Sequence, residues 1–314
     1  LTLTGRAEST CGLSGTSAGA MNAVVFADGF LKGRRQGAID ALEIFWRRVS
    51  RSAHVSAMFR PPELANNRQK QWNLDSSPGY IMMDLLTRLL SPYDLNPLDI
   101  NPLRVILDEL IDYEALRARD DLHVFVSASN VRTCKPRVFR TSELSTQVLL
   151  ATSCLPMMFQ TVEIDGEPYW DGGYLGNPAI HPLIHECISN DVIIVQINPM
   201  NRPDIPRSAK EIINRINEMS FNASLVREMR GIATVSRFVE DGLLTNTNYD
   251  RVNFHLIEAE VELGQLGASS KLNTDWKFLK HLHDLGYRTT ERWLDENFDK
   301  LQVTSTLDVF ERFT

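Results

Sequence analysis

A serine between two glycines near the start of the chain is the first group that could carry chemistry. The stretch GLSGTSAGAMNAVV, residues 12–25, places Ser17 between Gly15 and Gly19. This is the G-x-S-x-G pattern of a nucleophile elbow, a tight strand-to-helix turn that exposes a serine hydroxyl. Small residues such as Gly15, Ala18 and Gly19 avoid clashes there, and the N–H groups of the following helix favour an oxyanion. The pattern also fits a helix N-cap serine in a glycine loop, so both interpretations remain open on these residues alone.

A nucleophilic serine needs a base, and the histidines are poor candidates. None follows a late strand, where the chain order Ser, Asp, His would place the histidine of a triad. Two lie in predicted strands, two on a predicted C-terminal helix, and one pair is a helical turn apart. We therefore favour a carboxylate as the base. These six are His123, His255, His281, His283, His181 and His185, and the seventh histidine of the chain is His54.

An aspartate later in the chain is the better partner. In EIDGEPYWDGGYLGNPAI, Asp171 stands directly before Gly172 and Gly173, and two glycines let the backbone bring a carboxylate close to another loop. A D-G pair also marks a hairpin turn, but Asp165 and Gly166 fit that role better, because EIDGEPYW predicts two short strands that meet there. Asp171 then follows the second strand, where no turn is needed.

The two motifs together resemble the patatin-like phospholipase family. GTSAGAMNA and YWDGGYLGNPAI carry most of the resemblance, and SCLPMMF and NRINEMSFNASLVREMRGI resemble further segments of it. The resemblance implies a three-layer α/β fold, no metal or organic cofactor, and a dyad of Ser17 as nucleophile and Asp171 as base. It also implies hydrolysis of acyl esters of phospholipids or related lipids through an acyl-enzyme.

One family element is not visible near the N-terminus. The family has a glycine-rich loop of D-G-G-G-x-R-G type, which donates N–H groups to the oxyanion, between its first strand and the serine strand. Here LTL, residues 1–3, resembles the first strand, and STCGLSG, residues 9–15, resembles the serine strand. We expect a glycine-rich segment to be missing between them. Without it, a non-catalytic lipid-binding or effector module stays an alternative, as does a soluble short-chain esterase or thioesterase.

Composition narrows the class of protein. The chain has 314 residues, 43% of them hydrophobic, which suits a sizeable α/β core. A formal net charge of −7 argues against nucleic-acid binding. No apolar run reaches the roughly 18 residues of a membrane span. The cysteines lack zinc-site spacing and are typical of free buried thiols in the cytoplasm. They are Cys11, Cys134, Cys154 and Cys187.

The order of predicted elements indicates the architecture. Strands alternate with helices, which predicts a mostly parallel central sheet with helices on both faces. No Gly- and Ser-rich linker divides the chain, so we expect one domain over 1–314, with 208–314 as its helical C-terminal extension. Strands are predicted at 123–131, 191–199 and 251–259. Helices are predicted at 17–29, ending at Gly29, at 36–50, 80–90, 103–118, 146–154 and 208–244, and at 275–301 with an interruption at Gly286.

An apolar segment punctuated by prolines, residues 55–95, is a candidate for contact with a membrane surface. At a net charge of −7, such contact would rest on apolar side chains more than on attraction to phosphates. The same side chains could fill the core or a subunit contact, and the sequence leaves the oligomeric state open. The side chains concerned are Met58, Phe59, Ile81, Met82, Met83 and Leu86.

Overall fold

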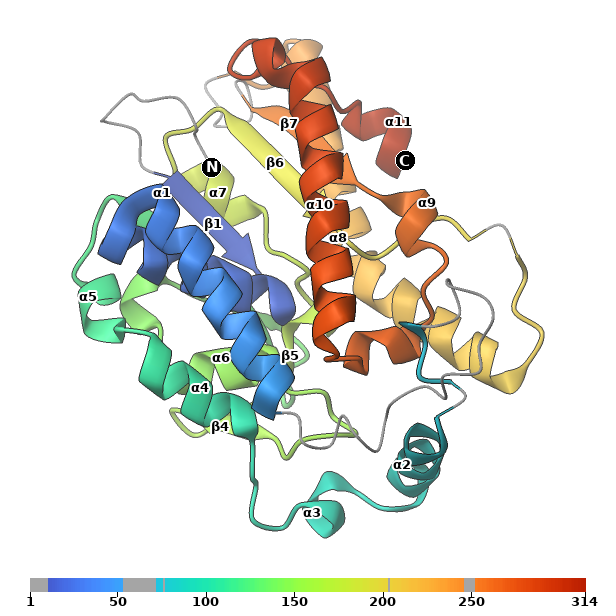
Figure 1. Cartoon of the computed structure of the whole chain (residues 1–314). Helices are drawn as coiled ribbons and strands as arrows, with labels where there is room; N and C mark the ends of the chain where they lie inside the picture. Colours follow the sequence, from blue (N-terminus) through green and yellow to red (C-terminus); the bar gives the residue numbers. More distant parts are fainter. Residues whose placement is uncertain (1–10, 53–71, 76, 203, 246–251) are drawn as a thin grey trace.

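The computed structural model describes residues 11–52, 72–75, 77–202, 204–245 and 252–314 (Figure 1). The expected gap near residues 4–9, and Met58 and Phe59 of the apolar segment, lie outside these ranges. The main sheet has the strand order β1-β2-β5-β4, with β3 also paired to β2. Its strands are β1 (Cys11–Gly15), β2 (Leu122–Asn130), β3 (Pro136–Phe139), β4 (Val162–Ile164) and β5 (Glu167–Asp171).

Helices cover this sheet, as expected for the α/β class. Alternate residues of β2 face one hydrophobic cluster, which it shares with the helices on that side. These helices are α1 (Ala18–Ser52), α4 (Pro102–Leu110), α5 (Tyr113–Arg117) and α6 (Thr146–Thr152). On the other face, α7 (His181–Glu186) lies against β1, since a Cβ built at Gly12 would meet Leu183 and Cys187.

The second sheet holds a separate hydrophobic cluster. Here β6 (Asp191–Gln196) pairs in parallel with β7 (Asn253–Glu258). Buried residues of both strands pack with α8 (Ala209–Glu240) and α11 (Val309–Phe313). The remaining helices are α2 (Pro78–Leu89), α3 (Pro92–Leu95), α9 (Glu260–Leu263) and α10 (Trp276–Asn297), with short 3-10 turns η3 (Thr141–Glu143), η4 (Gly172–Tyr174), η6 (Ala268–Leu272) and η7 (Phe298–Lys300).

The prediction of a mostly parallel sheet is wrong in strand direction. Within the main sheet only β1 and β2 are parallel, and the other ladders of the described strands are antiparallel. For two of these ladders the cause is local, because β2–β3 and β4–β5 are joined by short connections that permit only antiparallel pairing. The β4–β5 turn is the predicted one, with positive φ at Asp165 (53°) and Gly166 (79°).

Two glycines do not end helices as predicted. Helix α1 continues past Gly29 and instead kinks at Gly33 and Arg34, where φ and ψ are non-helical. A Cβ at Gly29 would lie 2.5 Å from the Gly37 carbonyl oxygen, so this glycine serves close packing across the kink. Helix α10 runs through Gly286 without interruption.

Side-chain burial departs from the sequence expectation in two further places. Strand β6 is not apolar and buried on both faces, since Val195 is 68% exposed. Three of the cysteines form no disulfide, and they differ in burial: Cys134 is exposed, Cys187 is half-buried and Cys154 is buried. Val195 lies on a strand face, and Cys134 in a turn, that the described residues leave uncovered.

Candidate active site

The turn between β1 and α1 presents Ser17. Strand β1 ends at Gly15, α1 begins at Ala18, and Ser17 between them has φ of 53°. A non-glycine residue in the left-handed region is strained, and such strain gathers at functional turns. An N-cap serine ordinarily adopts the β region instead, so the backbone favours the elbow over the cap. The Ser17 N–H donates to Thr152 Oγ1 at 3.0 Å, which ties the turn to the end of α6.

The two glycines around the elbow differ in what they do. A Cβ at Gly15 would lie 2.5 Å from the Gly19 carbonyl oxygen and 2.6 Å from the Ala20 nitrogen, so the turn has no room for a side chain there. Among the residues that the structure describes, a Cβ at Gly19 would meet nothing within 4 Å. The predicted need for small residues is therefore met sterically at Gly15, but at Gly19 the expected clash is absent because that position, like Ala18, is exposed.

Asp171 is the last residue of β5 and is fully buried. Its Oδ1 accepts a hydrogen bond of 2.7 Å from the Gly173 N–H. Its backbone N–H donates to the Cys154 carbonyl at 2.8 Å, and its carbonyl accepts from Ser129 Oγ at 2.8 Å. Within the described structure Oδ2 has no hydrogen-bond partner. A buried carboxylate oxygen without a partner is costly and calls for a functional explanation.

Strand β2 brings the serine and the aspartate together. Gly15 of β1 is in register with Val126, and Asp171 of β5 is in register with Ala128. The chain therefore places Ser17, two residues after Gly15, and Asp171 on opposite sides of the same stretch of β2. Gly172 lets the loop close on that stretch, because a Cβ there would lie 2.1 Å from the Ser127 carbonyl oxygen.

The surroundings of Asp171 change its acidity. Burial raises the pKa of Asp171 from 3.8 to about 6, while the Gly173 N–H, the Ser17 hydroxyl and the charge of Lys271 act to lower it. The Ser17 hydroxyl is thus close enough to Asp171 to favour the ionised carboxylate. Such contacts often tighten only when substrate binds. A carboxyl with this pKa is ionised at neutral pH and can accept a proton.

Side chains from the C-terminal half complete the surroundings, and the sequence motifs do not reveal them. Phe221 of α8 packs on the loop after Asp171, since a Cβ at Gly173 would lie 2.1 Å from its Cε1. The rings of Tyr174 and Phe221 are 5.1 Å apart between centroids. The Lys271 ammonium lies 5.3 Å from the centroid of the Phe221 ring. Spacing alone could not find them, because α8 and η6 reach the site only through tertiary packing.

Several histidines are engaged elsewhere. Buried His255 lies between Thr306 and Asp191, at 2.9 and 3.2 Å. His181 lies 3.4 Å from Glu228, and His281 stacks on Trp72. In the part of the chain that the structure describes, none of these contacts reaches Ser17 or Asp171.

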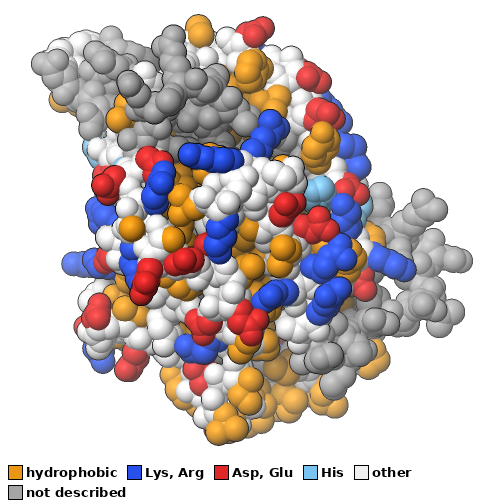
Figure 2. Space-filling model, turned by 60° about the vertical axis from the view of Figure 1, so that its left-hand side comes forward, with side chains coloured by type: hydrophobic (Ala, Val, Ile, Leu, Met, Phe, Trp, Pro, Cys, Tyr) orange, Lys and Arg blue, Asp and Glu red, His pale blue; other side chains and the backbone are white. Residues whose placement is uncertain are grey.

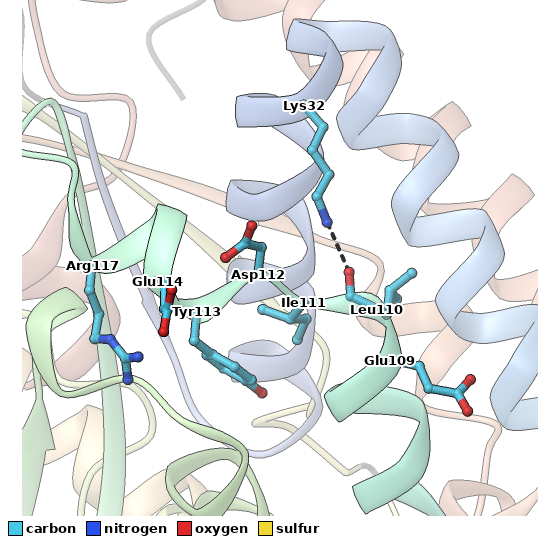
Figure 3. A pocket seen from close by; sticks show the side chains of 8 residues that line it. All are labelled: Lys32, Glu109, Leu110, Ile111, Asp112, Tyr113, Glu114 and Arg117. Atoms are coloured by element: carbon cyan, nitrogen blue, oxygen red, sulfur yellow. Dashed lines mark hydrogen bonds between the residues drawn. The ribbon is translucent and has the colours of Figure 1, made fainter.

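A hollow between α1, α4 and α5 lies apart from this site (Figure 3). Its lining includes Lys32, Asp112 and Tyr113, and neither Ser17 nor Asp171. The Lys32 ammonium spans it, donating to the Leu110 carbonyl at 3.0 Å and pairing with Asp28 at 2.7 Å. These polar groups bind one another, which is typical of a structural contact.

Other site types are not seen in the described ranges. No three His, Cys, Asp or Glu side chains there are grouped as metal ligands. No helix within the same ranges is both long and apolar enough to span a bilayer.

A strand-to-helix elbow that exposes a serine on a sheet covered by helices is characteristic of α/β hydrolases. Residues 12–184 match the family model described as patatin-like phospholipase. This range is more than half of the chain and includes both Ser17 and Asp171. The chain therefore belongs to the patatin-like phospholipase family, a family of lipid acyl hydrolases. The comparison with curated proteins found none that matches.

Proposed function

We propose that the protein is a serine acyl hydrolase that cleaves acyl esters of phospholipids or related lipids. Ser17 is the nucleophile and Asp171 is the base. The observation that carries the proposal is the buried Asp171 carboxylate. One of its oxygens has no hydrogen-bond partner among the described residues, and the hydroxyl of Ser17, a serine held at positive φ, acts to lower its pKa. An unsatisfied carboxylate beside a strained serine is the arrangement that proton abstraction needs.

The reaction follows from these positions. Asp171 accepts the Ser17 proton as Oγ attacks the acyl carbonyl, and the tetrahedral intermediate expels the alcohol, which leaves with that proton. The resulting acyl-enzyme is attacked by water, whose proton goes to Asp171 and then to Ser17 as the acid is released. The Ala18 N–H at the start of α1 is placed to donate to the oxyanion. A second donor is the role that we assign to the family's glycine-rich loop.

The apolar helix α2 supports a lipid substrate presented at a surface. None of its residues is buried, and Ile81, Met82, Leu85 and Leu89 are each more than half exposed. Hydrophobic side chains gather at the lower end of Figure 2, the end where Figure 1 places α2 and α3. This part of the apolar segment is thus not core, and we propose that it contacts the lipid surface.

The C-terminal region is proposed to be part of the same catalytic domain, over 1–314, with 208–314 as its extension. Contact between Phe221 of α8 and the loop after Asp171 supports this. The cytoplasmic location drawn from the cysteines stays a prediction.

A covalent probe tests the proposal. A fluorophosphonate is expected to label Ser17, as located by mass spectrometry of peptides, and Ser17→Ala is expected to lose both the label and ester hydrolysis. Ser14→Ala is the matched control on β1. Comparing dispersed short-chain esters with phospholipid vesicles separates a lipase from a soluble esterase. A folded protein that binds vesicles but neither takes the label nor cleaves any ester would instead be a non-catalytic lipid-binding module.

A further inference from the structure

A cation stands beside the proposed dyad. The Lys271 ammonium and Gly173, whose N–H holds the Asp171 carboxylate, both lie against the ring of Phe221. The charge of Lys271 acts to lower the pKa of Asp171, and that of Asp171 acts to raise the pKa of Lys271. Lys271 remains accessible to solvent, yet the surrounding protein is dense enough that burial lowers the pKa of its ammonium.

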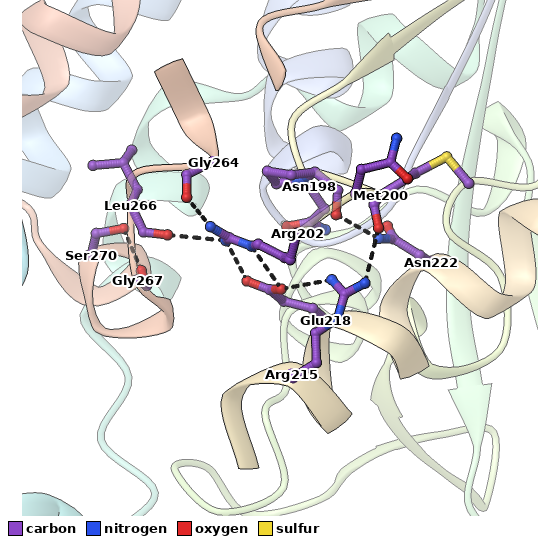
Figure 4. Close-up of polar contacts among 12 residues, drawn as sticks. Asn198, Met200, Arg202, Arg215, Glu218, Asn222, Gly264, Leu266, Gly267 and Ser270 are labelled. Carbon is purple, nitrogen blue, oxygen red and sulfur yellow. Dashed lines mark hydrogen bonds and ion pairs between the residues drawn. The ribbon is translucent and has the colours of Figure 1, made fainter. Parts of the chain in front are cut away.

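The backbone that carries Lys271 is fastened from the side of α8. The Arg202 guanidinium donates to the carbonyls of Gly264 and Leu266, just before η6 (Figure 4). Glu218 holds that guanidinium from α8, at 2.6 and 3.2 Å, and is itself buried. Charge-assisted bonds of this kind, two of them in parallel, fix geometry well.

The same backbone is fastened from the other side by residues 72–74. The Gly267 N–H donates to Asn73 Oδ1 at 2.8 Å, and the Leu74 N–H donates to Ser269 Oγ at 3.1 Å. Asn273 donates to the Trp72 carbonyl at 3.0 Å. Lys271 is thus presented by a rigid turn and not by a loose loop.

The charges around this turn do not neutralise the lysine. Arg202, Arg215 and Lys271 surround the single carboxylate of Glu218, and both arginines bind it. The arginines also donate to backbone carbonyls, Arg215 to that of Met200 at 3.0 Å. In the described structure no carboxylate lies within ion-pair distance of the Lys271 ammonium. Of the three cations, Lys271 is the one without an ion-pair partner among the described residues.

We propose that Lys271 forms a subsite beside the Ser17–Asp171 dyad that binds an anionic group, a phosphate or carboxylate, of the ester substrate. The proposal rests on the proposed function and adds the substrate class, namely anionic acyl esters. A role limited to fastening Asp171 is disfavoured, because Asp171 Oδ2 has no hydrogen-bond partner among the described residues, Lys271 included. An accessible, rigid and unpaired ammonium is what recognition of an oxyanion requires.

Two matched pairs of monomeric esters test this and separate the two sources of the anion. The first pair is p-nitrophenyl butyrate and its analogue with a carboxylate at the end of the acyl chain. The second is dihexanoylglycerol and dihexanoyl phosphatidic acid, which place a phosphate on the alcohol side. Values of kcat/KM are measured near pH 8, where Asp171 is ionised. The proteins are the wild type, Lys271→Met, Lys271→Arg and the exposed control Lys277→Met, which makes the same change in charge.

Loss of one charged contact corresponds to about 10- to 100-fold in selectivity. Lys271→Met is therefore expected to lower the ratio of anionic to neutral kcat/KM by that factor in one pair, which identifies the source. Lys271→Arg is expected to restore most of the ratio, and Lys277→Met to leave it unchanged. A ratio within twofold of the wild type in both pairs, or an equal loss in Lys277→Met, would overturn the proposal.

A binding measurement keeps this result separate from the proposed function. Calorimetric titration of hexyl phosphate and of hexanol into Ser17→Ala protein, with and without Lys271→Met, needs no turnover. We expect hexyl phosphate to bind about tenfold or more weakly without Lys271, and hexanol to bind equally. Equal binding of hexyl phosphate refutes the subsite even in an active hydrolase. Lysine-dependent binding supports it even if the wild type cleaves none of the esters.

Discussion

Asp171→Asn is expected to abolish ester hydrolysis and at the same time to stabilise the fold at neutral and alkaline pH. Burial raises the pKa of Asp171 from 3.8 to about 6. The folded protein therefore holds this proton more tightly than the unfolded chain, and ionisation destabilises the fold. The cost is absent below pH 3.8, grows as the pH rises, and is complete above about pH 6. At about 1.4 kcal/mol per pKa unit, the full cost is roughly 3 kcal/mol.

Asparagine suits this position sterically. Its Oδ1 can accept the Gly173 N–H, and its amide nitrogen replaces an Oδ2 that has no partner in the described structure. The cost of burying that amide does not depend on pH. The informative quantity is therefore how the difference in unfolding free energy between the variant and the wild type changes with pH. The unfolding free energy of Asp171→Asn minus that of the wild type should rise by about 2 kcal/mol from about pH 4.5 to about pH 8.5.

Urea denaturation, followed by circular dichroism and tryptophan fluorescence at several pH values, measures this difference. Asp295→Asn, an exposed position on α10, is the matched control and should give a flat difference. A difference for Asp171→Asn that stays flat, or falls as the pH rises, would refute the argument that the carboxylate is buried at a cost. Full ester hydrolysis by the folded variant would refute its role as the base.

Three further outcomes follow from the same geometry. The kcat/KM of the wild type should rise with pH through an apparent pKa of about 6, because only ionised Asp171 accepts the serine proton; a pH-rate profile without that inflection would contradict this. Gly15→Ala should lower the unfolding free energy by about 1–3 kcal/mol or more because its Cβ meets backbone, whereas Gly19→Ala should be neutral or slightly stabilising; equal melting temperatures would be inconsistent with the steric argument. Replacing Ile81 and Leu85 by serine should weaken co-sedimentation with phosphatidylcholine vesicles several-fold at both low and high salt, since an apolar contact is not screened; binding that vanishes on modest addition of salt would point to an electrostatic contact instead.

The sequence by itself determined the α/β class, the tight turn at Ser17 and the place of Asp171 at the end of a strand. These features depend on local chemistry. The turn that holds Ser17 at positive φ has no room for a Cβ at Gly15, so that position requires glycine. The hairpin at Asp165 and Gly166 leaves Asp171 at the end of the following strand. The periodic helices α6 and α8 and the strands β2 and β7 could likewise be predicted, since their hydrophobic patterns are read within one element.

Only the tertiary structure decided what surrounds Ser17 and Asp171 and how the sheet is built. Strand direction depends on which neighbours pair. The helix kinks at Gly33, and Gly29 is a glycine because of close packing across that kink and not because a helix ends there. Phe221 and Lys271 lie far along the chain from Ser17, and neither belongs to a recognisable motif. They reach the site because α8 packs on the loop after Asp171 and Arg202 fastens the turn before η6, contacts between distant segments that no local spacing encodes.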